Sequence, residues 1–219
     1  DLRKCIRFVL SGLQGTRFPV PYSEIDGSLQ EYMRLIHGEE YTNRRVLNKD
    51  FIGPSSYTLQ MEHIMENKDD DSKKINILNN YTVTDKADGE RKLLYINKEG
   101  KIYMIDTNMN VIFTGTQTLE KTHYNSLLDG EHIKYDKNNN YINLFAAFDV
   151  YYVNGRSTRD YPFYKEISND EEDEKTTQKN DEPRKKMDEN SRLHIMRDFV
   201  DRLSIYSIMD KTVDNEVKP

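Results

Sequence analysis

The chain has 219 residues, and its 38 acidic side chains outnumber its 32 lysines and arginines, so the formal net charge is −6. This length allows one sizeable domain, or one domain with a fragment of another. The composition excludes collagen-like and disulfide-rich classes, and no apolar run reaches the roughly 18 residues that a membrane span needs. The single cysteine, Cys5, cannot form an internal disulfide, which favours a reducing compartment and a cytoplasmic location.

The N-terminal part is expected to form a strand and then a helix. In residues 1–22, apolar side chains alternate over a short stretch, at Ile6, Phe8 and Leu10, and two prolines follow. A helix is expected to begin at Ser23 as its N-cap and to end at Gly38. Its apolar face consists of Ile25, Leu29, Tyr32, Met33 and Ile36.

The middle of the chain is expected to be mainly strands. A short helix over 57–66 and a solvated loop over 67–74 come first, and the strand pattern begins at Tyr81. The expected strands cover 81–84, 93–96, 102–105, 111–113, 127–135 and 141–153. The turns at 97–100 and 136–140 join four of these strands into two hairpins, which predicts a largely antiparallel sheet.

The C-terminal part combines a charged segment with a helix. Met187 is the only apolar side chain in residues 168–190, so this segment is expected to be a mobile acidic loop on the surface. A helix over 192–209 should follow, because apolar residues recur at helical spacing. They are Leu193, Met196, Val200 and Leu203, with Phe199 beside them.

The most informative motif is Lys-Ala-Asp-Gly-Glu-Arg at residues 86–91. It is expected to begin where the strand over 81–84 ends and to turn at Gly89, so that Lys86 projects into a cleft. Lysine is a nucleophile only when it is neutral, and a neighbouring cation such as Arg91 favours the neutral form. The plain alternative is a hairpin turn with charged residues.

Two downstream segments add candidate binding residues. Asp-Gly-Glu at 129–131 is expected to be a turn that places the Glu131 carboxylate at the start of a strand, although an ordinary tight turn has the same pattern. The apolar strand over 144–150 contains Phe148 and Asp149. Phe148 is either a core residue or a platform on which a base stacks. The plain alternative for this segment is a core strand in which Asp149 is hydrogen-bonded to a turn.

Together these three segments resemble the covalent nucleotidyltransferase superfamily, which comprises DNA ligases, RNA ligases and mRNA capping guanylyltransferases. The resemblance implies an α+β fold, a mainly antiparallel-sheet nucleotidyltransferase core with flanking helices. It implies that Lys86 attacks the α-phosphate of a nucleoside triphosphate, and that magnesium or manganese assists. GTP is the expected substrate.

The resemblance also implies a role for each matching position. Arg91 would contact the ribose side of the nucleotide, and Glu131 would contact the ribose and help to place magnesium. Phe148 would stack on the base. Asp88 and Gly89 would shape the loop that carries the nucleophile.

A closer resemblance links residues 51–54, 58–59 and 80–91 to the guanylyltransferase domain of multifunctional capping enzymes from large DNA viruses. It implies that residues 1–38 are the end of a preceding triphosphatase-like region or a linker, and that 39–219 are the core. The implied partners are GTP, the 5′ end of nascent RNA and other capping domains of the same polypeptide. A viral factory or a virion would be the location.

The chain also departs from the superfamily pattern. The expected Glu-Gly strand and Lys-x-Lys strand do not follow Asp149, and an OB-fold is not expected in this fragment. Because the chain begins with Asp1, it is expected to be cut from something longer. Because the downstream strands and the OB-fold are missing, it is expected to be incomplete at its C-terminal end and not fully active alone. Two alternatives stay open: an ATP-dependent ligase adenylation domain and a non-catalytic interaction module on the same scaffold.

Overall fold

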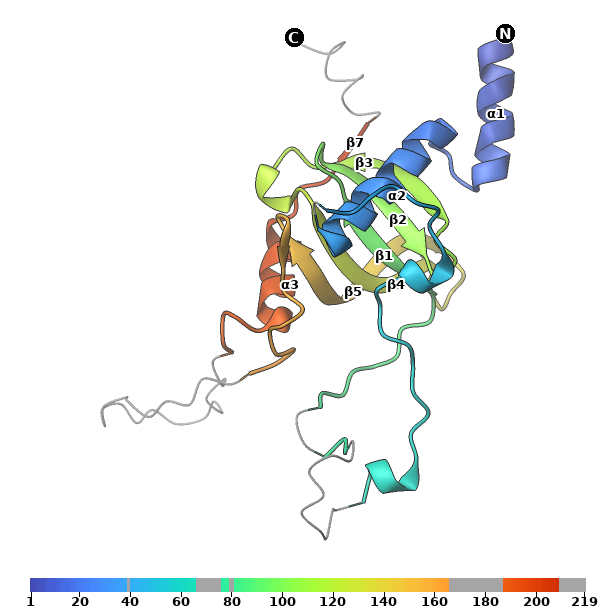
Figure 1. Ribbon diagram of the computed structural model, residues 1–219. Helices are drawn as coiled ribbons and strands as arrows, with labels where there is room; N and C mark the ends of the chain where they lie inside the picture. Colours follow the sequence, from blue (N-terminus) through green and yellow to red (C-terminus); the bar gives the residue numbers. More distant parts are fainter. Residues whose placement is uncertain (39, 66–75, 79–80, 166–186, 209–219) are drawn as a thin grey trace, which may run out of the picture.

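The computed structural model describes residues 1–38, 40–65, 76–78, 81–165 and 187–208 (Figure 1). In this part of the chain, three α-helices accompany one seven-stranded sheet with the order β6-β5-β4-β1-β2-β3-β7. Every neighbouring pair of strands is antiparallel. The expected α+β class and antiparallel pairing are therefore confirmed.

The helices and strands have the following bounds. The helices are α1 (Leu2–Gln14), α2 (Tyr22–His37) and α3 (Arg192–Arg202). The strands are β1 (Glu90–Ile96), β2 (Lys101–Asp106), β3 (Val111–Gln117), β4 (Ser126–Tyr135), β5 (Tyr141–Val153), β6 (Arg156–Ser157) and β7 (Tyr206–Ser207). Short 3₁₀ turns cover Asn48–Asp50, Met61–His63 and Lys121–His123. None of the helices in the described ranges is long and apolar enough to cross a bilayer.

Both predicted hairpins form, and each is closed by the first polar residue of its turn. The Asn97 side chain accepts hydrogen bonds from the backbone N–H groups of Glu99 and Lys101. The Asp136 carboxylate does the same for Asn138 and Asn140. Such local side-chain bonds define the turn geometry, which is why these hairpins could be predicted from sequence.

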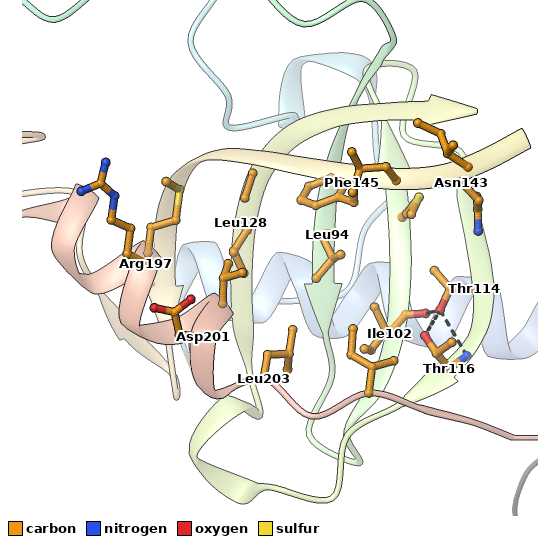
Figure 2. Close-up of a pocket in the computed structure, with 17 residues that line it drawn as sticks. Leu94, Ile102, Thr114, Thr116, Leu128, Asn143, Phe145, Arg197, Asp201 and Leu203 are labelled. Atoms are coloured by element: carbon orange, nitrogen blue, oxygen red, sulfur yellow. Dashed lines mark hydrogen bonds between the residues drawn. The ribbon is translucent and has the colours of Figure 1, made fainter. Parts of the chain in front are cut away.

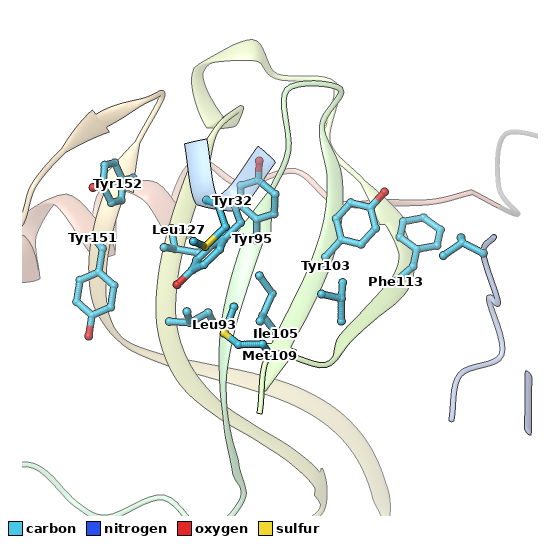
Figure 3. Close-up of a cluster of buried hydrophobic side chains, with 13 residues drawn as sticks. Tyr32, Leu93, Tyr95, Tyr103, Ile105, Met109, Phe113, Leu127, Tyr151 and Tyr152 are labelled. Atoms are coloured by element: carbon cyan, nitrogen blue, oxygen red, sulfur yellow. The ribbon is translucent and has the colours of Figure 1, made fainter. Parts of the chain in front are cut away.

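The sheet separates two hydrophobic cores. Along β1, Leu93 and Tyr95 face α2, whereas Leu94 and Ile96 face α3, as the two-residue period of a strand requires. The core on the α2 face is the larger (Figure 3) and contains Tyr32, Met33, Leu93, Tyr95, Tyr103, Ile105, Phe113, Leu127, Tyr151 and Tyr152. The core on the α3 face contains Leu94, Ile96, Ile102, Leu128, Val150, Met196 and Phe199.

Helix α2 crosses the sheet and packs on it through Tyr32 and Met33, which are fully buried (Figure 1). The helix was expected, but Pro21 and not Ser23 occupies the N-cap position. The predicted stop is confirmed, because Gly38 follows the helix with a φ of 86°. The domain boundary at residue 38 stays a prediction.

Three expected elements differ in the structure. The strand expected in residues 1–22 is wrong, because 2–14 form helix α1; its apolar residues recur every three or four positions, which is helical spacing. The helix expected over 192–209 ends at Arg202, since residues 206–207 pair with β3. The helix expected over 57–66 is reduced to a 3₁₀ turn.

The strand expected over 81–84 is also wrong. These residues have no regular structure, and the Val83 side chain is fully exposed. A strand needs a neighbour for its backbone hydrogen bonds, and β-branched residues alone do not supply one. The loop expected over 67–74 and most of the mobile acidic loop expected over 168–190 lie outside the described residues.

Candidate functional site

A buried ion pair lies at the centre of the candidate site. The Nε and Nη2 atoms of Arg91 on β1 donate to the two oxygens of Asp129 on β4, at 3.1 and 2.5 Å. Asp129 is completely buried, and the Tyr151 hydroxyl donates to the same carboxylate at 2.6 Å. Burial, followed by the bond to Asp129, raises the pKa of Tyr151, so the phenol stays protonated and can donate. The guanidinium is thereby held in one orientation.

The loop over 51–54 packs against the exposed side of this guanidinium. The Nη1 atom of Arg91 donates to the Pro54 carbonyl oxygen at 2.6 Å, and its Cζ lies 5.4 Å from the centre of the Phe51 ring. A Cβ atom on Gly53 would lie 2.6 Å from Nη2 of Arg91. A side chain at position 53 would therefore displace the Phe51 ring or the Arg91 guanidinium, so glycine favours this close approach.

Helix α2 fixes the start of that loop. The Tyr32 hydroxyl donates to the Asp50 carbonyl oxygen at 2.7 Å and accepts from the Ile52 backbone N–H at 3.3 Å. The Asp50 side chain is bound by both Nη atoms of Arg44, at 2.9 and 2.6 Å. These contacts lower the pKa of Asp50, chiefly through the bonds from Arg44. The loop is thus tied to both the helix and the sheet.

Phe148 reaches the site through an irregularity in β5. The strand ladder pairs Asp129 with Asp149 and Gly130 with Ala147, which leaves Phe148 as an extra residue on β5. Such a bulge redirects a side chain and is common beside active sites. Phe148 is 37% exposed, belongs to neither hydrophobic core, and has its ring centre 5.7 Å from Cζ of Arg91.

Glu131 lies directly opposite Arg91 in the β1–β4 ladder. Its Oε2 atom is buried and has no hydrogen-bond partner among the described residues. Leaving a buried acceptor unsatisfied costs about 1–3 kcal/mol, and more for a charged group. This oxygen is therefore a candidate ligand for a group that the protein alone does not provide.

The expected turn at Asp129-Gly130 is wrong, because both residues lie inside β4. A Cβ atom on Gly130 would lie 2.5 Å from the Phe145 ring and 2.6 Å from the Ala146 carbonyl oxygen. Glycine here allows β5 to approach closely and does not make a turn. The glycine of this Asp-Gly pair is explained by the contact with β5, which the neighbouring residues of the sequence do not predict.

Asp149 is bonded to a helix and not to a turn. Both its oxygens accept from Arg192, from Nε at 2.8 Å and from Nη2 at 3.1 Å. Arg192 is the first residue of α3, so this ion pair holds the helix start against β5.

The structure brings Arg91, Glu131 and Phe148 together on three neighbouring strands, but it does not bring Lys86 and Asp88 to them. Lys86 lies in an exposed segment before β1, and its ammonium donates to the Ala87 carbonyl oxygen at 3.3 Å. Among the described residues, this is the one hydrogen bond of that ammonium. The expected position of Lys86 at a strand end is therefore wrong.

Gly89 joins the motif to the sheet. A Cβ atom there would lie 2.7 Å from the His132 carbonyl oxygen on β4, so only glycine fits this approach. Immediately after it, Glu90 binds Lys134 at 2.9 Å and Lys92 at 3.1 Å. These bonds, first the one from Lys134, lower the pKa of Glu90 to about 2. The end of the Lys86 segment is thus fixed by packing and by charge.

A separate cavity of about 600 Å³ lies on the α3 face of the sheet (Figure 2). Its wall is mostly apolar and includes Leu94, Leu128, Phe145, Met196 and Leu203. Arg91, Glu131 and Phe148 are not part of this wall. The cavity is therefore distinct from the ion-paired site.

Asp129 and Tyr151 belong to the site but were not predicted from the sequence. One signal was available for Asp129, since it lies two positions before Glu131 and so on the same side of the strand. For Tyr151 no local signal existed, because it lies at a second register shift of β5: Leu128 pairs with Val150 and Leu127 pairs with Tyr152, which leaves Tyr151 as an extra residue.

Tyr151→Phe is expected to lower the free energy of unfolding by about 1.5–3 kcal/mol, since it removes a buried hydrogen bond to a charged group. Urea denaturation measures this change. Tyr152→Phe is the matched control, because the neighbouring tyrosine is also buried and its hydroxyl makes no hydrogen bond among the described residues. Equal losses in the two variants would contradict a specific role for the Tyr151–Asp129 bond.

Glu90→Gln is expected to destabilise the protein at pH 7 but not at low pH. A lowered pKa means that the ionised Glu90 stabilises the fold above its ordinary pKa of 4.5. This contribution is lost as the pH falls from about 5 toward 2. Chemical denaturation across that range measures it, and a double-mutant cycle with Lys134→Gln isolates the pair. A difference that stays constant with pH would contradict this prediction.

Comparison with known proteins shows the family of the chain. The profile of the family described as "mRNA capping enzyme, catalytic domain" matches residues 47–218. The chain is also 33% identical, over 148 residues, to the "Probable mRNA-capping enzyme" of Acanthamoeba polyphaga mimivirus. That alignment covers 67% of this chain but 11% of the relative, so the chain spans a small part of that protein's length. The chain belongs to the family of mRNA capping enzyme catalytic domains.

Proposed function

We propose that this domain is the guanylyltransferase of a multi-domain mRNA capping enzyme, built on a nucleotidyltransferase core. It would transfer GMP from GTP, through a covalent lysyl-GMP intermediate, to the 5′-diphosphate end of RNA. The observation that supports this best is the family match over 47–218, which contains the Lys86 motif and all three residues that meet at the site. The substrates and the neighbouring capping domains are part of the proposal.

The geometry fits one way of holding a guanine nucleotide. The half-exposed ring of Phe148 is available for stacking on the base. A guanidinium has five N–H donors, and Asp129 and Pro54 use three of those of Arg91. Two donors remain for the ribose, and the Arg91–Asp129 pair fixes their direction.

Lys86 would perform the covalent chemistry. Its neutral amine attacks the α-phosphorus of GTP, a phosphorus–nitrogen bond forms, and the bond to the β-phosphate oxygen breaks as pyrophosphate leaves. The terminal oxygen of the RNA diphosphate then attacks the same phosphorus, and the lysine amine leaves. Because Lys86 lies in an exposed segment here, nucleotide binding has to bring it to the α-phosphate in line with the leaving group.

Glu131 fits a role in placing a divalent cation. Magnesium is typically held by one or two carboxylates together with substrate phosphates, and the buried Oε2 of Glu131 lacks a partner among the described residues. When bound, magnesium or manganese neutralises charge on the phosphates. Glu131 can alternatively accept a ribose hydroxyl, because both roles use the same free oxygen.

In the full-length protein, Lys86→Met is expected to abolish covalent labelling by radioactive GTP without unfolding the domain. Methionine keeps the length of the side chain and removes the amine that forms the phosphoramidate. Lys137→Met, which changes an exposed lysine in the β4–β5 turn, is the matched control and should label normally.

The same assay separates the alternatives. Labelling by ATP in place of GTP would indicate a ligase-type adenylation domain. Labelling that persists in Lys86→Met would place the nucleophile elsewhere, and no labelling of the wild-type protein would favour a non-catalytic module.

Phe148→Leu is expected to weaken GTP binding about 5- to 150-fold, since one stacked base is worth about 1–3 kcal/mol. Titration calorimetry on the full-length protein measures this affinity. Phe163→Leu is the matched control, because Phe163 also lies against an arginine, 5.7 Å from Arg192, but outside the site. An unchanged affinity with a large fall in melting temperature would make Phe148 a core residue.

A further inference from the structure

Helix α1 stands away from the sheet, and none of its side chains is buried (Figure 1). At 100° per residue its two sides differ sharply. One side is apolar and consists of Leu2, Ile6, Val9 and Leu13. The opposite side has Lys4, Arg7, Phe8 and Ser11 at positions i, i+3, i+4 and i+7. This second side forms a surface of its own.

The chain after α1 turns back toward this basic side. Gly15 has the left-handed φ of 62° that ends a helix, and the Thr16 N–H donates to the Ser11 carbonyl oxygen at 3.2 Å. The Ser11 hydroxyl in turn donates to the Thr16 carbonyl oxygen. This double link places Arg17 beside the helix. Lys4, Arg7, Phe8, Ser11 and Arg17 surround a hollow of about 500 Å³, here called the α1 hollow.

The α1 hollow concentrates positive charge in a chain whose net charge is −6. Lys4, Arg7 and Arg17 form no ion pair with any carboxylate among the described residues. Phe8 is 77% exposed beside them. Cations around an exposed aromatic ring are the combination that binds single-stranded nucleic acid, because phosphates pair with the cations and bases stack on the ring.

We propose that the α1 hollow binds the single-stranded RNA that follows the 5′ end to be capped. Lys4, Arg7 and Arg17 bind its phosphates, and Phe8 stacks on a base. This inference rests on the proposed function in one respect, that RNA is the substrate. It adds a second RNA-binding site, separate from the nucleotide site.

A basic amphipathic helix can also lie on an anionic membrane. A membrane would bind the apolar side of α1, and the side chains inserted into the bilayer would be Leu2, Ile6, Val9 and Leu13. The α1 hollow lies on the other side, and there the large aromatic Phe8 accompanies the cations. A concave cationic site with its own aromatic ring matches a nucleic acid strand better than a flat bilayer.

Fluorescence anisotropy with a short single-stranded RNA ending in a 5′-diphosphate tests the inference at several salt concentrations. Each phosphate contact contributes about 0.7 to the slope of log K against log salt for single strands. The double variant Arg7→Gln/Arg17→Gln should therefore lower that slope by about 1.4. Lys137→Gln/Arg156→Gln changes the net charge equally at exposed positions elsewhere and should leave the slope unchanged. Equal effects of the two variants would overturn the inference.

Phe8→Leu tests stacking separately. It should weaken RNA binding by about fivefold or more, without changing the salt slope, since it removes the ring and no charge. The melting temperature should not change, because α1 buries no side chain. RNA affinity that is unaffected by Phe8→Leu would overturn the stacking role.

Two further measurements separate this site from its alternatives. Vesicles with anionic lipids should bind equally well to wild type and to Arg7→Gln/Arg17→Gln. If the variant loses vesicle binding but keeps RNA binding, the α1 hollow is a membrane site instead. In the full-length protein, the same variant should still be labelled by GTP, because no RNA takes part in that step. Failure of GTP labelling in the wild type would refute the proposed function, whereas loss of the RNA effect alone would refute this inference.

Discussion

The buried ion pair between Arg91 and Asp129 determines the geometry of the candidate site. A buried carboxylate without its cation destabilises a protein by about 3–5 kcal/mol, so neither side chain can turn away from the other. Tyr151 adds a third bond, and Pro54 holds the other side of the guanidinium. The pair therefore joins strands β1, β4 and β5 to the loop over 51–54. The remaining site residues take their positions from this connection.

The two faces of the sheet have different roles. The α2 face contains the ion pair and the larger core, in which Tyr32 supports the loop beside Arg91. The α3 face contains the smaller core and the cavity, and the Asp149–Arg192 pair holds α3 there. Phe148 avoids both cores because a bulge redirects it. The register shift at Phe148 thus keeps this ring out of the packing of the domain.

Charge is distributed unevenly over this acidic chain. At the candidate site, Arg91 is neutralised by a buried carboxylate, and the Oε2 atom of Glu131 has no hydrogen-bond partner among the described residues, which suits the proposed ligand with both hydroxyl groups and a bound cation. At the α1 hollow, three cations have no carboxylate partner among the described residues, which suits phosphates alone. A local positive electrostatic potential attracts anionic ligands to its part of the surface even when the net charge of the protein is negative.

Much of the fold and part of the site could be predicted from sequence because their causes are local. The Asn97 and Asp136 turns are closed by bonds within a few residues, and two-residue alternation defines the strands that they join. Arg91 and Glu131 were identified by their motifs, but the pairing of β1 with β4 that places them opposite each other was not predicted. Local sequence led to wrong predictions in two segments. Residues 81–84 have strand-forming side chains but no neighbouring strand to pair with, and residues 2–14, where a strand was expected, form a helix.

Only the tertiary structure decided which side chains complete the site. Asp129 is a buried partner of Arg91 because two strands distant in sequence pair in one register, and Tyr151 joins them at a register shift between β4 and β5. The sequence by itself determined the chemistry that is available, namely a lysine motif, a carboxylate and an aromatic ring. It could not determine their arrangement, because register and burial depend on contacts between strands that no local pattern encodes.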